Sequence, residues 1–142
     1  MRNSYSLLDS VATTAQKIAD EFGVRVVRDE QLRFSDAHTE DLATHVKRAT
    51  IRFSRKGARI PSSLWLPWIE TRPDDDTYTM PRGKIFIPRI VVAHLEDFTD
   101  EDARADFFVN RDGMREGMKK IYPWIDEKSI GSVYYLDDVL TN

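Results

Sequence analysis

The sequence predicts a small α+β domain in which short strands form a barrel that carries helices. Short alternating or β-branched runs, separated by turn signals, fill the middle of the chain, as is typical of small barrels. Segments with apolar residues at helical spacing lie on both sides of them. The length of 142 residues suits one domain with a core of its own.

Two helices are expected before the first strong strand. At 5–22 apolar residues recur at helical spacing, a glycine follows as a stop signal, and Ser4 or Ser6 is placed to cap the first turn. The second helix is shorter and covers 36–44, with Asp36 as its cap.

Two further helices are expected near the C-terminus. Thr99 followed three positions later by Asp102 is a capping-box pattern, so a short helix should run from there to about Asp106. Asn110 is placed to cap the last helix, which covers 111–122 and ends at a proline.

The strands are recognised by alternation and by β-branched residues. Pro67 indicates a sheet edge or a bulge, and Pro88 divides one long run into two strands or bulges it. A polar loop is expected at residues 72–76. The predicted strands are 24–27, 49–54, 63–71, 84–95 and one that begins at 133–136.

Composition excludes several classes of protein. The chain has no cysteine, so it has no disulfide, no thiolate metal site and no cysteine nucleophile. No stretch approaches the roughly 18 apolar residues of a membrane helix, and the first residues lack the apolar centre of a signal peptide. We expect a cytoplasmic protein with no membrane partner.

Charge is unevenly distributed along a chain whose net charge is −3. Residues 42–69 contain no acidic side chain and six lysines and arginines, whereas residues 96–106 contain six acidic side chains and one arginine. Two solvated surfaces would explain this pattern, but a basic segment on an acidic protein is also suited to an anionic ligand.

Four short motifs follow one another in the order and at the distances found in a known family. They are Lys47-Arg-Ala-Thr-Ile-Arg52, Asp100-Glu-Asp-Ala-Arg-Ala-Asp-Phe-Phe108, Met118-Lys-Lys-Ile-Tyr-Pro123 and Val133-Tyr-Tyr-Leu136. The succession resembles the ASCH family over about residues 32–139. The resemblance implies a PUA-like β-barrel at residues 32–142 and an N-terminal helical extension at residues 1–31 that packs on the barrel.

The same resemblance implies a function and a site. ASCH proteins are expected to bind RNA or nucleotides, some small bacterial members deacetylate acetylcytidine, and others act as ribonucleases. The amidohydrolases use a lysine, a threonine and an acid, which match Lys47, Thr50 and Asp106. The chain departs from the family in having His45-Val46 before the lysine, Arg48 after it, and Asp in place of Glu as the acid.

Amide hydrolysis gives each of these residues a role. The Thr50 hydroxyl would be the nucleophile, the Lys47 amine its base, and the Asp106 carboxyl the acid for the departing amine. Positions 47 and 50 share one face only if Lys47 lies in the turn before the strand. Arg52, on the face of Thr50, could hold a carbonyl, a phosphate or the acid. The competing interpretation is a solvated lysine, a threonine chosen for β-propensity and an exposed aspartate.

Other side chains are candidates for ligand binding. With Arg52 they are Arg48, Arg55 and Trp65, whose ring could stack on a base; core packing is the competing interpretation for Trp65 and Trp68. The histidines lack metal-ligand spacing, so we expect neither a metal nor a cofactor.

Three functions remain open at this point: an amidohydrolase for an acylated cytidine, a ribonuclease for single-stranded RNA, and a non-catalytic RNA-binding module. The N-terminal helix is expected to pack on the barrel or to form a homodimer contact.

Overall fold

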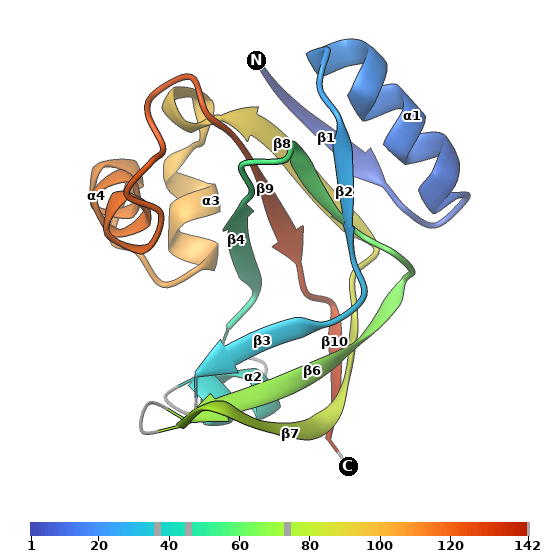
Figure 1. Ribbon diagram of the computed structural model, residues 1–142, viewed down its shortest axis with the longest axis vertical. Coiled ribbons are helices and arrows are strands. Elements are labelled where there is room, and N and C mark those ends of the chain that lie inside the picture. The colour runs from blue at the N-terminus through green and yellow to red at the C-terminus, as the bar shows by residue number, and fades with distance from the viewer. Residues whose placement is uncertain (36–37, 45–46, 73–74, 142) are drawn as a thin grey trace.

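The protein has an α+β fold, and the part of the chain that the structure describes forms two four-stranded sheets, a two-stranded sheet and four α-helices (Figure 1). It is seen in a computed structural model that describes residues 1–35, 38–44, 47–72 and 75–141. No helix in these ranges is long and apolar enough to cross a membrane.

The first sheet has the order β1-β8-β9-β4, with every neighbour antiparallel. The second has the order β10-β7-β6-β3, in which only β3 and β6 run parallel. The third is the parallel pair β2-β5. The strands are β1 (Arg2–Ser6), β2 (Val26–Asp29), β3 (Leu32–Ser35), β4 (Ala49–Phe53), β5 (Ala58–Pro61), β6 (Trp65–Arg72), β7 (Asp75–Phe86), β8 (Arg89–His94), β9 (Ile130–Tyr135) and β10 (Asp138–Thr141).

The α+β prediction is therefore confirmed, but a closed barrel is not what the strand pairing shows. Across the strands that the structure describes, no sheet closes on itself through hydrogen bonds. In Figure 1 the β3-β6-β7-β10 sheet lies below the other four-stranded sheet, with α3 and α4 beside β4 and α1 at the opposite end.

The helices are α1 (Val11–Phe22), α2 (Thr39–Ala43), α3 (Asp100–Ala105) and α4 (Arg111–Ile121). The last two confirm the sequence signals. Thr99 and Asp102 form the predicted capping box of α3, and the Asn110 side chain accepts a hydrogen bond from the Gly113 amide at the start of α4. The cap predicted at Asp36 lies outside the described residues.

The prediction that the first helix begins at residue 5 is wrong. Residues 2–6 form β1, which pairs with β8, and the helix begins after Ser10, whose hydroxyl accepts from the Thr13 amide. The sequence of β1, Arg-Asn-Ser-Tyr-Ser, is mostly polar and resembles a loop, and only Tyr5 is buried. Gly23 ends α1 in the left-handed conformation, with φ 64°, as its stop signal predicts.

The strand predictions also need corrections. The strand expected at 24–27 is β2, which begins and ends two residues later. Strands β3 and β5 were not predicted. Strand β9 begins three residues earlier than expected and is followed by β10. Pro67 pairs only with β7, because the β3 register begins at Trp68, and a bulge follows between Trp68 and Ile69. Pro88 separates β7 from β8.

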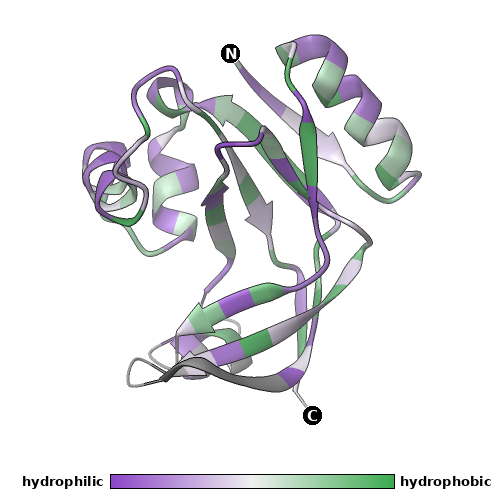
Figure 2. Cartoon of the chain, viewed as in Figure 1, coloured by the Kyte–Doolittle hydropathy of each residue, from purple (hydrophilic) through white to green (hydrophobic). Residues whose placement is uncertain are grey.

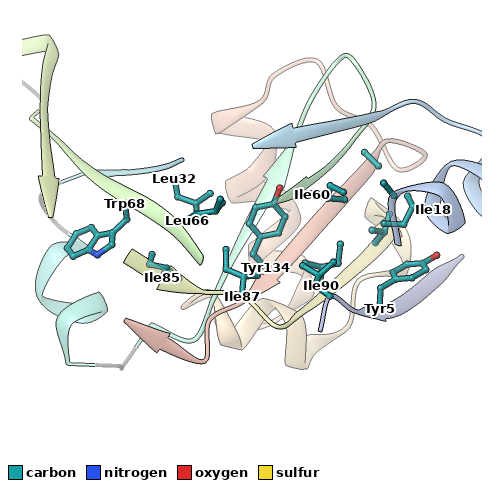
Figure 3. Close-up of a cluster of buried hydrophobic side chains, with 14 of the residues drawn as sticks. Tyr5, Ile18, Leu32, Ile60, Leu66, Trp68, Ile85, Ile87, Ile90 and Tyr134 are labelled. Carbon is teal, nitrogen blue, oxygen red and sulfur yellow. The ribbon is translucent and has the colours of Figure 1, made fainter. Parts of the chain in front are cut away.

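The core consists of two clusters of buried side chains. One lies between the sheets and under α1, and Figure 3 shows Tyr134 of the first sheet between Leu66 of the second sheet and Ile18 of α1. The second cluster lies between the first sheet and helices α3 and α4. Along β3 hydrophobic and hydrophilic residues alternate, so the strand turns one face toward the core (Figure 2).

Residues 1–31 contribute more than a helix. They supply strands β1 and β2 and core side chains that include Tyr5, Leu7 and Ile18. The apolar face of α1 therefore packs within its own chain, and dimerisation through this helix remains a prediction.

Candidate functional site

The segment that begins at Lys47 approaches β4 from α2. The Lys47 amide donates to the Asp41 carbonyl at 3.1 Å, and the strand starts two residues later at Ala49. Lys47 thus lies just before the strand and Thr50 within it, as the geometry of the predicted site requires. The neighbouring His45 lies outside the described residues.

Asp106 comes to this segment from the end of α3. One carboxylate oxygen forms an ion pair with the Lys47 amine, and the other accepts the backbone N–H of Ile51 at 3.1 Å. The side chains of Lys47 and Asp106 are only 4% and 9% exposed. A buried carboxylate therefore fixes the lysine and the strand together.

Arg52 lies beside Thr50 on the same face of β4. Its Nε donates to Thr50 Oγ1 at 3.1 Å, its Nη2 donates to the Arg33 carbonyl at 3.2 Å, and the guanidinium lies 5.0 Å from the centre of the Phe34 ring. Burial lowers the pKa of Arg52, with a nearby tyrosine and Asp106 opposing the effect. Among the described residues Arg52 forms no direct salt bridge, and it shares the lining of the hollow with Asp106.

These side chains line one hollow of about 390 Å³, within the size range of small-molecule sites. Its remaining walls come from β3, from the end of α3 and from α4. The lining residues are Arg33, Phe34, Ser35, His38, Lys47, Thr50, Ile51, Arg52, Asp106, Phe108, Met118, Ile121 and Tyr122.

The structure does not bring the other predicted ligand-binding residues to this hollow. Arg48 lines a second, neighbouring hollow. The Arg55 guanidinium lies 5.0 Å from the centre of the Trp124 ring. Trp65 is 37% exposed and stacks on Phe86 with ring centres 5.0 Å apart, whereas Trp68 is fully buried in the core.

The basic segment is consequently not one continuous surface. Lys47 is paired with Asp106 of the acidic segment, and Arg59 is bound through two nitrogens by Asp29, which also accepts from the Tyr134 hydroxyl at 2.7 Å. Only part of the predicted positive charge remains for a ligand.

The aromatic walls of the hollow were missed by the sequence analysis. Phe34 belongs to a strand that was not predicted, although the alternation Leu32-Arg-Phe-Ser35 is a strand signal. Phe108 and Tyr122 lie within the family motifs, but nothing in their spacing indicated a shared hollow. They add aromatic side chains to a lining that also holds the charged groups.

The described residues contain no group of three His, Asp or Glu side chains arranged to hold a metal ion.

No protein-family model matches the sequence, and no curated protein matches it. The fold is similar to that in the crystal structure of protein EF3133 from Enterococcus faecalis V583, a DUF984 protein. The TM-score is 0.53 and the sequence identity 12%, and the match covers 95% of each chain. At this identity the likeness concerns the fold alone.

Proposed function

We propose that the hollow binds a nucleoside or an unpaired nucleotide of RNA, and that the protein is an ASCH-type domain with a PUA-like architecture. The observation that carries the proposal is the presence of Lys47, Thr50, Arg52 and Asp106 in the lining of a single hollow. Three of these residues come from one segment and the fourth from a helix much later in the chain.

The chemistry of the walls supports a nucleoside as ligand. Phe34, Phe108 and Tyr122 place aromatic rings in the lining, and aromatic rings are the usual partners of unpaired bases. Arg52 offers guanidinium N–H groups to a carbonyl or phosphate oxygen, and Asp106 and Thr50 offer acceptors. Unpaired bases are read by this combination of stacking and edge contacts.

Hydrolysis of an N-acylated cytidine is the reaction that the polar groups support best. The Thr50 oxygen would attack the acyl carbonyl carbon, and its proton would pass to the Asp106 carboxylate. The carbon–nitrogen bond then breaks, and the cytosine amino nitrogen takes up that proton. Water hydrolyses the threonine ester to release the carboxylic acid.

Two contacts support this division of roles. Arg52 donates to the Thr50 oxygen, where its positive charge would favour loss of the hydroxyl proton as attack begins. Lys47 already donates to Asp106, so the carboxylate is better placed than the amine to accept a proton. In this scheme Lys47 holds the carboxylate in position instead of acting as the free base that the sequence analysis expected.

Incubation with N4-acetylcytidine tests the reaction directly, through release of cytidine and acetate. Thr50→Val preserves the shape and removes the hydroxyl, so release should stop, and Thr50→Ser should retain it. Thr14→Val is the matched control, because Thr14 is an equally buried threonine in α1 whose hydroxyl donates to backbone carbonyls. Equal turnover by Thr50→Val and wild type would exclude the mechanism.

Binding is tested separately by following backbone amide shifts in NMR during titration with cytidine. Shifts should concentrate at Thr50, Arg52 and Asp106 and should disappear in Arg52→Ala. Arg28→Ala is the control, because Arg28 is exposed on β2 and lines neither hollow. Shifts scattered over other surfaces would refute the assignment.

Two alternatives are distinguished by the same variants. A ribonuclease would cleave labelled single-stranded RNA, and the cleavage would depend on Thr50 or Asp106. A non-catalytic module would bind RNA with a steep salt dependence and form no product.

A further inference from the structure

A second hollow of about 450 Å³ adjoins the first. Arg48 and Ala105 line the second hollow, whereas their immediate neighbours Lys47 and Asp106 line the first. Since consecutive Cα atoms are about 3.8 Å apart, the segments 47–48 and 105–106 form a shared wall. The second hollow is completed by Pro88, Arg89, Glu101, Tyr135, Leu136 and Asp137.

One wall of this second hollow is a flat cation that stacks on a tyrosine ring. The Arg89 guanidinium carbon lies 3.9 Å from the centre of the Tyr135 ring, and Arg89 Nη1 donates to Ser4 Oγ at 3.1 Å. The Tyr135 hydroxyl is itself held by Asp102 at 2.5 Å. The stack therefore joins side chains from three neighbouring strands and helix α3.

The charges of the second hollow select the kind of ligand. Two guanidinium groups, on Arg48 and Arg89, are balanced by the carboxylates of Glu101 and Asp137. A bare phosphate is poorly matched to a hollow without net charge. A planar group that carries both acceptors and donors is well matched, because it can stack on Arg89 and engage charges of both signs.

Guanine has the required edges. Arginine recognises its O6 and N7 acceptors, which is the most common specific contact between proteins and bases. Its ring N–H and amino group are two adjacent donors that suit a carboxylate. Adenine has no ring N–H on that edge and offers only its amino group.

We infer, on the basis of the proposed function, that the second hollow binds the base of a guanosine next to the nucleotide in the first hollow. The ligand class is then a single-stranded RNA with cytidine and guanosine as neighbours. Arg48, Arg89 and Tyr135 select the second base, and Thr50 and Arg52 contact the first.

The experiment measures the affinity of wild-type protein for cytidine and for the dinucleotides CpG, GpC, CpA and ApC by isothermal titration calorimetry. At least one guanosine dinucleotide should bind about tenfold more tightly than cytidine, which is the gain typical of one further stacked base. Arg48→Ala and Arg89→Ala should remove this gain and leave cytidine affinity unchanged. Arg28→Ala should alter neither, and circular dichroism checks the fold of each variant.

The outcomes separate this inference from the function on which it rests. Cytidine binding without any gain from either guanosine dinucleotide would overturn the second site alone, as would an equal gain from CpA and ApC. Dinucleotide binding that depends on Arg89 but not on Arg52, with no binding of cytidine, would support the second site and overturn the first. Absence of binding by all five ligands would overturn both.

Discussion

Lys47 and Asp106 form an ion pair that joins the start of β4 to the end of α3 across 59 positions of the chain. Both side chains are buried, and the second oxygen of Asp106 is occupied by the Ile51 amide. The pair therefore fixes the position of the strand that carries Thr50 and Arg52, whatever its part in chemistry.

Breaking this pair on one side should destabilise the protein strongly. Lys47→Met leaves a buried carboxylate unpaired, and Asp106→Asn leaves a buried ammonium unpaired while keeping an acceptor for Ile51. Each should lower the free energy of unfolding by about 3 kcal/mol, as found for other buried pairs. The double variant should lose much less than the sum, because no uncompensated charge remains.

Chemical denaturation of the four proteins in this double-mutant cycle measures the coupling. The exposed pair Lys128–Glu96 supplies the control cycle, through Lys128→Met and Glu96→Gln, and should show little or no coupling. Additive losses at Lys47 and Asp106 would contradict the buried ion pair.

Two glycines of α4 should respond differently to alanine. A Cβ at Gly117 would lie 2.5 Å from Phe108 Cε1, whereas at Gly113 the nearest atom is 3.6 Å away. Gly113→Ala should stabilise the protein by about 0.5–1 kcal/mol through helix propensity. Gly117→Ala should cancel that gain and displace the Phe108 ring, which is a wall of the first hollow.

Thermal unfolding of the two variants measures stability, and the cytidine titration reports the hollow. Gly113→Ala serves as the control because it lies on the same helix and makes an ordinary contact. A Gly117→Ala protein that is as stable as Gly113→Ala and binds cytidine equally well would show that Phe108 does not need this close approach.

The parts of the fold that depend on local signals could be predicted from the sequence. The caps at Thr99 and Asn110 act within three residues, and the alternation at 49–54 predicts the strand that is found as β4. Strand β1 could not be found in this way. Its pairing with β8 is set by residues almost 90 positions away, and a mostly polar strand has no alternation of hydrophobic residues to reveal it.

The same distinction applies to the candidate site. Lys47, Thr50 and Arg52 lie within six residues, so a strand prediction alone placed Thr50 and Arg52 on one face. Asp106 was brought to them only by the family resemblance, since no local pattern links it to β4. Phe34 was not found because β3 pairs with the distant strand β6 and meets the other walls of the hollow, on β4 and α4, only in the folded chain.

Acid stability should depend on Asp102. Burial by itself raises the pKa of this carboxyl, but hydrogen bonds from Arg2, Tyr135 and the Thr99 amide outweigh it and lower the pKa below the ordinary value of 3.8. A carboxyl with a lowered folded-state pKa stabilises the protein fully above its unfolded value. That stabilisation is lost as the pH falls through the folded value.

Asp102→Asn should therefore cost about 2–3 kcal/mol of unfolding free energy at pH 7, in line with hydrogen bonds to charged groups. The difference in unfolding free energy between wild type and Asp102→Asn should shrink as the pH is lowered below about 3.8. Denaturant titrations between pH 2 and pH 7 would follow both proteins. Asp100→Asn is an exposed control at the start of the same helix, and a pH-independent difference for Asp102→Asn would contradict the linkage.

Phe107 stores backbone strain at the end of α3. It is a non-glycine residue with φ 66°, at the position after the helix where glycine is usual. The Phe107 amide donates to Arg104 at 3.1 Å and the Phe108 amide to Ala103 at 2.9 Å, so the left-handed turn is required to satisfy these carbonyls. Its ring is 46% exposed and lies 5.5 Å from the Lys47 amine.

Two substitutions separate the strain from the ring. Phe107→Ala removes the ring and keeps the strained side chain, whereas Phe107→Gly removes both. The glycine variant should be about 1 kcal/mol more stable than the alanine variant in chemical denaturation, because left-handed backbone costs an L-residue about that much. It should also stay close to wild type, since the lost contact with Lys47 offsets the relieved strain. An alanine variant as stable as the glycine variant would show that the turn relaxes once the ring is gone.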